Sequence, residues 1–219
     1  YDRTQAVDAY GDLKDVPWPV AGSLLFIENR ELLDKRISHR NPAVEWTRLL
    51  YASAQAAMRV VQPNRKVPGA STLATQMEKF RHSDGGRTHS AKGKLRQMTS
   101  AALRAYLSGP NTAAARERIL VDYLNSVPLG ATRAYGEITG FAGGLRAWFN
   151  ADFDQVNDAL RGAERMKADD PRLPEAALAL RQSLALLVGL RRPAHYLRDD
   201  REAVARLSRV YLPQLAEAG

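Results

Sequence analysis

The chain has 219 residues, of which 45% are hydrophobic and 26% are charged, and this composition is typical of a globular protein rather than a disordered one. Its formal net charge of +8 and pI near 9.9 favour a polyanionic or anionic-surface partner, such as nucleic acid, phosphorylated lipid or membrane headgroups. Because the chain contains no cysteine, disulfides and thiolate metal sites are excluded.

The N-terminal part of the chain predicts a lead-in followed by one apolar run. Residues 1–22 are polar or interrupted by proline, whereas the run 23–34 begins apolar and becomes charged at Glu28. Periodicity does not separate a buried helix turn from a strand in this run. The uncharged stretch 16–27 is shorter than the roughly 20 apolar residues that span a bilayer, and no secretory signal is recognisable, so we expect any membrane anchor to precede Tyr1.

A loop signal at 63–69 leads into the stretch GASTLATQMEKF, residues 69–80, which is compatible with a helix. Upstream of it, Asn41-Pro42 predicts the start of a helix that ends at Pro63. Helical spacing in the stretch places Leu73, Met77 and Phe80 on an apolar face and Thr72, Gln76 and Lys79 on a polar one. Backbone N–H groups at such a helix start suit a phosphate. Periodicity alone favours an ordinary amphipathic helix capped by Ser71 or Thr72.

The rest of the chain predicts further helices that are separated by proline and glycine. The segment 83–87 is predicted to be a turn, and Thr112 is expected to cap the helix that follows it. The predicted helices are 90–107, 112–127, 137–149, 152–168, 175–189 and 200–218. Outside 23–34, no stretch alternates Val, Ile and Thr over the length of a strand. The predicted fold class is therefore mainly α.

Several of these segments, taken in order, resemble one bacterial family. GASTLATQ followed by Lys79 is similar to a Gly-Ser-Thr-x-x-x-Gln signature, RERILVDYLN at 116–125 to a basic-x-x-Ile-Leu-x-x-Tyr-Leu-Asn motif, and LLVGLRRPAHY at 186–196 to a leucine-rich segment that ends in a proline turn. These motifs are typical of the peptidoglycan glycosyltransferases, the transglycosylase domains of penicillin-binding proteins (glycosyltransferase family 51). The resemblance implies a lysozyme-like helical lobe with a smaller membrane-proximal jaw lobe. It also implies one domain over 23–219, with the jaw at about 64–110 and an extra helical insertion at about 150–172.

Two of the family's motifs are altered in this chain. FIEN at 26–29 stands where the family has a Glu-Asp pair followed by Phe, His and Gly, so that Glu28 is kept and Asn29 replaces the Asp. The family also carries Arg-Lys-x-x-Glu after its mobile loop, and that Glu is its second catalytic-site carboxylate. Between Arg87 and Arg116 this chain has no Asp or Glu. In any register the position is filled by Leu95, Gln97 or Met98.

The resemblance implies that a growing glycan on lipid pyrophosphate is transferred to the 4-hydroxyl of a lipid-linked disaccharide. Glu28 would act as the general base near that hydroxyl. Hydroxyl, amide and cationic groups would bind the substrate: Ser71, Thr72, Gln76, Lys79, Arg87 and Lys94. The family also implies a divalent cation such as Mg2+ at the pyrophosphate. The missing carboxylate argues against that cation here, and no residue is assigned to a metal site.

The partners that the resemblance implies are the lipid-linked peptidoglycan precursor, glycan strands and the membrane surface, at the outer face of the bacterial cytoplasmic membrane. Two functions remain open: an active glycosyltransferase with an altered site, and a catalytically impaired relative that binds precursor or glycan. A lysozyme-type hydrolase with Glu28 as general acid is a further alternative, against which the transferase motifs argue. Because no nucleic-acid-binding motif accompanies the basic charge, nucleic acid is not an expected partner.

Overall fold

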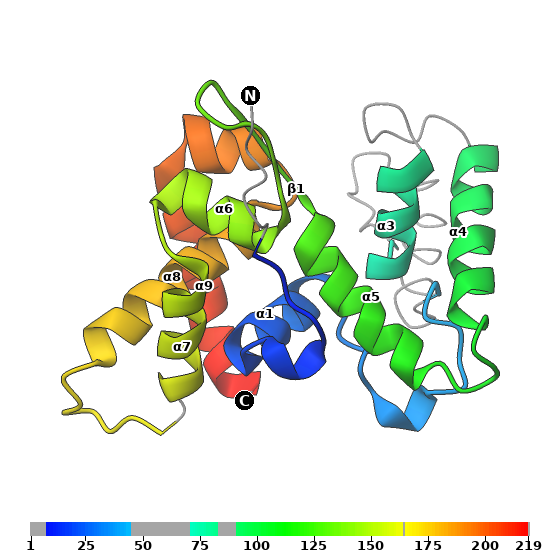
Figure 1. Cartoon of the computed structure of the whole chain (residues 1–219), viewed down its shortest axis with the longest axis horizontal. Helices are drawn as coiled ribbons and strands as arrows, with labels where there is room; N and C mark the ends of the chain where they lie inside the picture. The colour runs from blue at the N-terminus through cyan, green and yellow to red at the C-terminus, as the bar shows by residue number, and fades with distance from the viewer. Residues whose placement is uncertain (1–7, 45–70, 83–90, 164, 219) are drawn as a thin grey trace, which may run out of the picture. The chain divides into compact units, whose positions relative to one another are not determined.

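The computed structural model describes residues 8–44, 71–82, 91–163 and 165–218, with only the backbone at 80–82, 91, 92 and 94, and it is mainly helical (Figure 1). The α-helices of this part are α1 (Trp18–Glu28), α3 (Leu73–His82), α4 (Ala91–Ala105), α5 (Ala113–Ser126), α6 (Gly140–Phe149), α7 (Phe153–Ala163), α8 (Leu173–Gly189) and α9 (Arg201–Ala218). The remaining elements are the 3-10 helices η1 (Leu13–Asp15) and η2 (Lys35–Ile37), the π-helix η4 (Ala194–Asp199), and strands β1 (Pro128–Thr132) and β2 (Gly136–Thr139). The predicted mainly α fold class is confirmed.

The chain divides into two compact units. One contains residues 1–27 and 120–219, and the other contains residues 28–119. The boundaries fall at the last residue of α1 and inside α5, so these two helices contribute residues to both units. None of the helices described for this chain is both long and apolar enough to cross a membrane.

The apolar run near the N-terminus forms α1 rather than a strand. Pro19 lies in the first turn of this helix, where a missing N–H removes no intrahelical hydrogen bond. The helix is apolar around most of its circumference, and Val20, Leu24 and Ile27 are buried. A helix with apolar residues on all sides is stabilised by packing on several sides rather than along one stripe. This explains why periodicity did not identify it.

In the first unit, Asn125 and Tyr10 join segments that are far apart in the chain. Asn125 Nδ2 donates to Tyr10 O at 2.8 Å, and Tyr10 N donates to Asn125 Oδ1 at 3.0 Å. The Tyr10 hydroxyl donates to Asn157 Oδ1 on α7 at 2.8 Å, and the Tyr10 ring packs against Phe153 with centroids 4.9 Å apart. Burial raises the pKa of Tyr10, so its hydroxyl remains a hydrogen-bond donor. These bonds fix the N-terminal segment against α5 and α7.

The antiparallel β1–β2 hairpin corrects two predictions. The sequence predicts no strand in this region and a helix beginning at Glu137, whereas residues 136–139 form β2 and α6 begins at Gly140. The strands have five and four residues, and their register shifts between Pro128 and Ala131. Such short, irregular strands contain too few residues for an alternating pattern to be visible in the sequence.

In the second unit, α3 and α4 pack side by side (Figure 1). A cluster of small buried side chains, Ala43, Ala74 and Ala101, lies at the centre of this packing, with Ala102 and Ile119 partly buried against it. Small side chains allow helices to approach closely. The predicted apolar face of α3 is confirmed for the buried Leu73 and Met77, whereas the Phe80 side chain lies outside the described part. The helix start predicted at Asn41-Pro42 is wrong, because residues 41–44 form a turn in which Ala43 N donates to Asn41 Oδ1 at 2.9 Å; the rest of that prediction, to Pro63, lies outside the described residues.

In the first unit, two glycines at the β1–β2 hairpin test how closely the start of α6 packs against α5. Gly136 and Gly140 both have positive φ values, 69° and 73°. A Cβ atom on Gly140 would lie 2.5 Å from Asn125 O, whereas one on Gly136 would have nothing within 4 Å. We expect Gly136→Ala to lower the free energy of unfolding by about 1 kcal/mol through backbone strain, and Gly140→Ala by about 3 kcal/mol because a clash is added. Urea denaturation measures both losses, and equal losses would contradict the clash.

Candidate functional site

Residues 28–29 meet the first turns of α3 through two side-chain hydrogen bonds. Gln76 Nε2 donates to Glu28 Oε2 at 3.1 Å, and the N–H of Leu73 donates to Asn29 Oδ1 at 3.3 Å. Glu28 is only 8% exposed, and Asn29 is also buried. Glu28 and Asn29 of the FIEN segment therefore lie against Leu73 and Gln76 of the GASTLATQ segment. The amide oxygen of Asn29 accepts from a backbone N–H at the start of α3, where the helix has no acceptor of its own.

Two reciprocal hydrogen bonds between Thr72 and Thr75 cap the start of α3. Thr72 N donates to Thr75 Oγ1 at 2.9 Å, and Thr75 N donates to Thr72 Oγ1 at 3.3 Å, which is the arrangement of a capping box. The Thr72 hydroxyl also contacts Ala43 O at 3.2 Å, and Thr72 is fully buried. The structure thus makes Thr72 the cap of α3, so its hydroxyl is engaged with the protein backbone rather than facing solvent.

The other predicted substrate-binding residues differ in how far the structure describes them. Gln76 and Lys79 are half-buried, and their spacing of three residues places them on the same side of α3. Ser71 is exposed directly before the helix. Arg87 lies outside the described residues, and Lys94 belongs to α4 with only its backbone described. The structure therefore brings Glu28 and Gln76 together, adds Lys79 beside Gln76, and does not place the other two cationic groups.

On α4, the three residues predicted at the place of the missing carboxylate have different environments. Leu95 is exposed, Met98 is half-buried, and Gln97 is buried. Gln97 is therefore the one of the three whose side chain is enclosed by protein. An amide has no negative charge with which to attract a cation. All three candidates for the position of the family's carboxylate are therefore neutral, and the buried one is an amide.

The described residues do not fit a divalent cation. No group of three or more His, Asp or Glu side chains in this part of the chain is arranged to hold a metal ion. Among the described residues, the Gln76 amide contacts the Glu28 carboxylate, and the Asn29 amide oxygen accepts from Leu73 N. Magnesium and calcium prefer carboxylate and carbonyl oxygens in larger number. We therefore describe the chemistry of this site without a metal.

Arg116 is a residue of this region whose role the sequence did not reveal. It is buried, and all five of its N–H donors are hydrogen-bonded. Its acceptors are Thr112 Oγ1 at 2.9 Å and the backbone oxygens of Glu31 at 3.2 Å, Leu32 at 2.9 Å, Ile37 at 3.1 Å and Arg40 at 2.8 Å. Arg116 therefore fixes the segment 31–40, which directly follows Glu28 and Asn29. Its helical spacing with the buried Leu120 and Tyr123 is the sequence signal that could have revealed its burial.

Two comparisons with known proteins bear on these segments. A family model described as transglycosylase matches residues 2–215, which is nearly the whole chain. A search of curated proteins found no match. The matched range includes the Glu28–Asn29 pair, helices α3 and α4, and Arg116.

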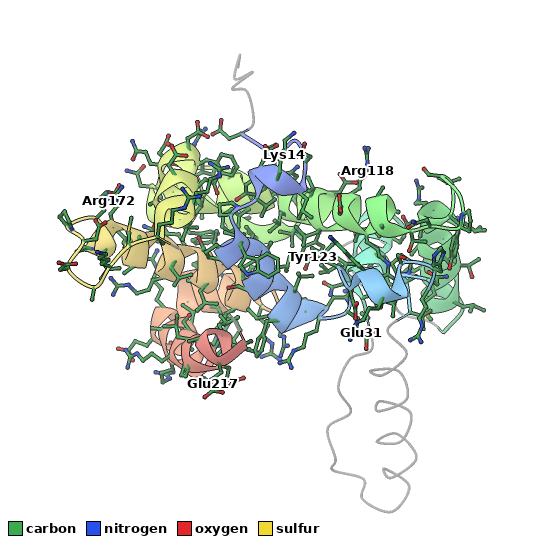
Figure 2. The ribbon with its side chains drawn as sticks, turned by 90° about the horizontal axis from the view of Figure 1, so that it is seen from below. Lys14, Glu31, Arg118, Tyr123, Arg172 and Glu217 are labelled. Carbon is green, nitrogen blue, oxygen red and sulfur yellow. The ribbon has the colours of Figure 1, made fainter. Side chains whose placement is uncertain are left out.

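Replacement of Arg116 by methionine tests its structural role. Arg116→Met removes five hydrogen bonds from a charged donor, to the Thr112 hydroxyl and to four backbone oxygens that are buried or partly buried, so we expect the free energy of unfolding to fall by about 3–5 kcal/mol. Amide hydrogens of residues 31–40 should also exchange faster. The matched control is Arg118→Met, because Arg118 is an exposed arginine on the same helix (Figure 2) and its loss should change stability by less than about 0.5 kcal/mol. Similar losses in both variants would show that Arg116 does not anchor this segment.

Proposed function

Because the chain belongs to the transglycosylase family, whose domains are peptidoglycan glycosyltransferase-like, we propose that it binds a lipid-linked disaccharide-pyrophosphate precursor and polymerises it into glycan strands with Glu28 as general base. The observation that carries the proposal is the 3.1 Å hydrogen bond from Gln76 to Glu28. It joins the two segments in which this chemistry would reside. Family membership also indicates extracytoplasmic peptidoglycan synthesis, and we propose the outer face of the cytoplasmic membrane as its location.

In this proposal Glu28 accepts the proton of the 4-hydroxyl of the acceptor disaccharide. The resulting oxygen nucleophile attacks the anomeric carbon of the donor glycan, the bond to the pyrophosphate oxygen breaks, and its electron pair leaves with the pyrophosphate. The Gln76 amide orients the carboxylate before the reaction, so less reorganisation is needed in the transition state. Burial of Glu28 excludes water that would compete for the same proton transfer.

The departing pyrophosphate requires positive charge in the same place. Lys79 lies on the side of α3 that carries Gln76, and its ammonium would neutralise a phosphate oxygen as a point charge. Arg87 would contribute a guanidinium fork, and Lys94 a second ammonium. The exposed Ser71 hydroxyl would donate to the sugar or the phosphate. In this arrangement cationic side chains supply the charge neutralisation.

A second candidate function is that of a catalytically impaired relative which binds precursor or glycan without polymerising it. The observation that favours it is the buried Gln97 on α4, together with the absence of Asp and Glu between Arg87 and Arg116. Removal of one key charged group from such a site commonly lowers the rate by about 100- to 1000-fold. The same change has little reason to weaken anion binding, because it removes negative charge.

We propose the membrane surface as a further partner, and α4 supports this proposal. Leu95 and Leu103 of α4 and Leu107 in the turn after it are exposed by 65%, 66% and 80%. The eight-residue spacing of Leu95 and Leu103 places these two within about 80° of each other around α4. Thr99 lies between them, and its hydroxyl donates to Leu95 O at 3.0 Å, so it needs no water. The exposed Arg96 and the lack of acidic residues over 88–115 suit an anionic lipid surface.

The catalytic proposal is tested with labelled lipid-linked disaccharide-peptide precursor, in magnesium and in EDTA. We expect the wild type to form glycan polymer and Glu28→Gln to form at least about 100-fold less, with precursor affinity changed by less than a few-fold. Lys79→Ala should weaken precursor binding by about tenfold, because one phosphate contact is lost. The control is Glu117→Gln, which changes an exposed carboxylate of α5. Precursor binding by a wild type that makes no polymer would support the impaired relative, and the absence of binding would overturn both functions.

The membrane proposal is tested by sedimentation with phosphatidylglycerol vesicles. We expect the double variant Leu95→Ser, Leu103→Ser to reduce the vesicle-bound fraction by about tenfold, since two exposed leucines no longer enter the lipid interface. Leu178→Ser is the control, because Leu178 is a half-exposed leucine of α8 in the other unit. Equal reduction by the control, or equal binding of the wild type to neutral phosphatidylcholine vesicles, would contradict the proposal.

A further inference from the structure

A second buried carboxylate lies on α3, directly before Lys79. Glu78 is only 2% exposed, although glutamate is rarely buried to this degree unless it is paired. The Ser100 hydroxyl donates to Glu78 Oε2 at 2.6 Å, and Arg104 Nε lies 2.9 Å from Glu78 Oε1. Both partners belong to α4, and Arg104 is half-exposed to solvent. Glu78 therefore connects α3 to α4 through a charge-assisted pair of contacts.

These contacts determine which way α3 is turned. Successive residues in an α-helix are about 100° apart, so Glu78 and Gln76 point to nearly opposite sides of α3. When Glu78 faces α4, Gln76 faces Glu28. Ser100 and Arg104 are one turn apart on α4, so together they fix the position of α3 along α4 as well as its rotation.

The apolar contacts described between the two helices are less directional than these polar ones. One buried cluster of this packing consists of alanines, Ala43, Ala74 and Ala101, which present small and similar surfaces, and Leu73 and Met77 of α3 are buried as well. Apolar burial is non-directional, whereas a hydrogen bond requires a particular distance and angle. Buried polar groups are best known for this role of selecting one register among several.

We propose that Glu78 is a positioning residue, which holds α3 at the rotation where Gln76 reaches Glu28 and Lys79 lies beside Gln76. This inference rests on the proposed function of Glu28 and adds a residue that acts on it through α3. Glu78 does not replace the missing carboxylate of α4, because its oxygens are directed to Ser100 and Arg104, away from Gln76. The family motif by itself gives no such role to this position, which lies between the Gln and the Lys that it shares with this chain.

The side-chain amide of Gln76 reports on this inference without any substrate. In a 15N–1H NMR spectrum, Glu78→Ala should move the Gln76 side-chain amide resonances toward the position of an exposed glutamine. Glu78→Gln retains an acceptor for Ser100 and Arg104, so it should restore most of the wild-type position. The control is Glu117→Ala, on the exposed side of α5, which should leave the resonances unchanged. Unchanged Gln76 resonances in a folded Glu78→Ala protein would overturn the inference.

Two single-contact variants keep the test decisive if Glu78→Ala does not fold. Ser100→Ala and Arg104→Ala each remove one contact to Glu78, and each should shift the Gln76 resonances part of the way; no shift in either would overturn the inference. Turnover provides a second measurement. Misplacement by about 1 Å commonly costs about 100-fold, so kcat of Glu78→Ala should fall by about that factor while KM changes by less. If Glu28→Gln does not reduce polymerisation, the proposed function fails, whereas the NMR result still decides the role of Glu78.

Discussion

The position of the catalytic candidate depends on the guanidinium group of Arg116. Residues 31–40 contain only the three-residue helix η2, so most of their backbone oxygens have no partner in regular secondary structure. Arg116 donates to four of these oxygens and to the Thr112 hydroxyl, which in turn donates to Ser38 O at 2.6 Å. Buried oxygens without a donor would cost about 1–3 kcal/mol each. The backbone that follows Glu28 is therefore fixed by an arginine from a distant helix, and the family-like motif at 116–125 begins with a structural residue.

Within the second unit, hydrogen bonds and an ion pair determine the position and rotation of α3 more closely than apolar contacts do. The cap oxygen of Asn29 fixes the start of α3, Gln76 fixes one side of it against Glu28, and Glu78 fixes the opposite side against α4. Each contact joins segments that are far apart in the sequence. The alanine cluster between these helices offers few interlocking shapes, so the polar contacts add the directionality that selects one rotation of α3. The arrangement of the candidate site is thus a property of its hydrogen bonds more than of its apolar packing.

The parts of this structure that were predictable from sequence are those that local chemistry determines. Helical periodicity identified α4, α5, α8 and α9 within two residues, and Thr112 marked the start of α5, because caps and amphipathic faces depend on neighbours in the chain. The helix predicted over 152–168 begins as expected but ends at Ala163. The β1–β2 hairpin was missed because its strands are too short for a pattern. The roles of Arg116 and Glu78 were missed for another reason: their acceptors and donors lie on distant segments, and backbone oxygens leave no trace in a sequence. The contact between Glu28 and Gln76 was foreseeable only through the order of family-like motifs.

At this site, the differences from the family motifs remove negative charge. Asn29 is neutral where the family motif has an Asp, the candidates Leu95, Gln97 and Met98 are all neutral, and the carboxylate of Glu78 is paired with Arg104. Arg96 lies in the stretch between Arg87 and Arg116, which has no acidic residue. Fewer negative charges strengthen the attraction for a pyrophosphate or an anionic lipid, because less repulsion opposes binding. In the proposed mechanism the same loss leaves proton abstraction to Glu28 alone. The proposed binding of an anionic precursor and its proposed polymerisation therefore depend on different groups: binding on the cationic side chains, and polymerisation on the one carboxylate that Gln76 contacts.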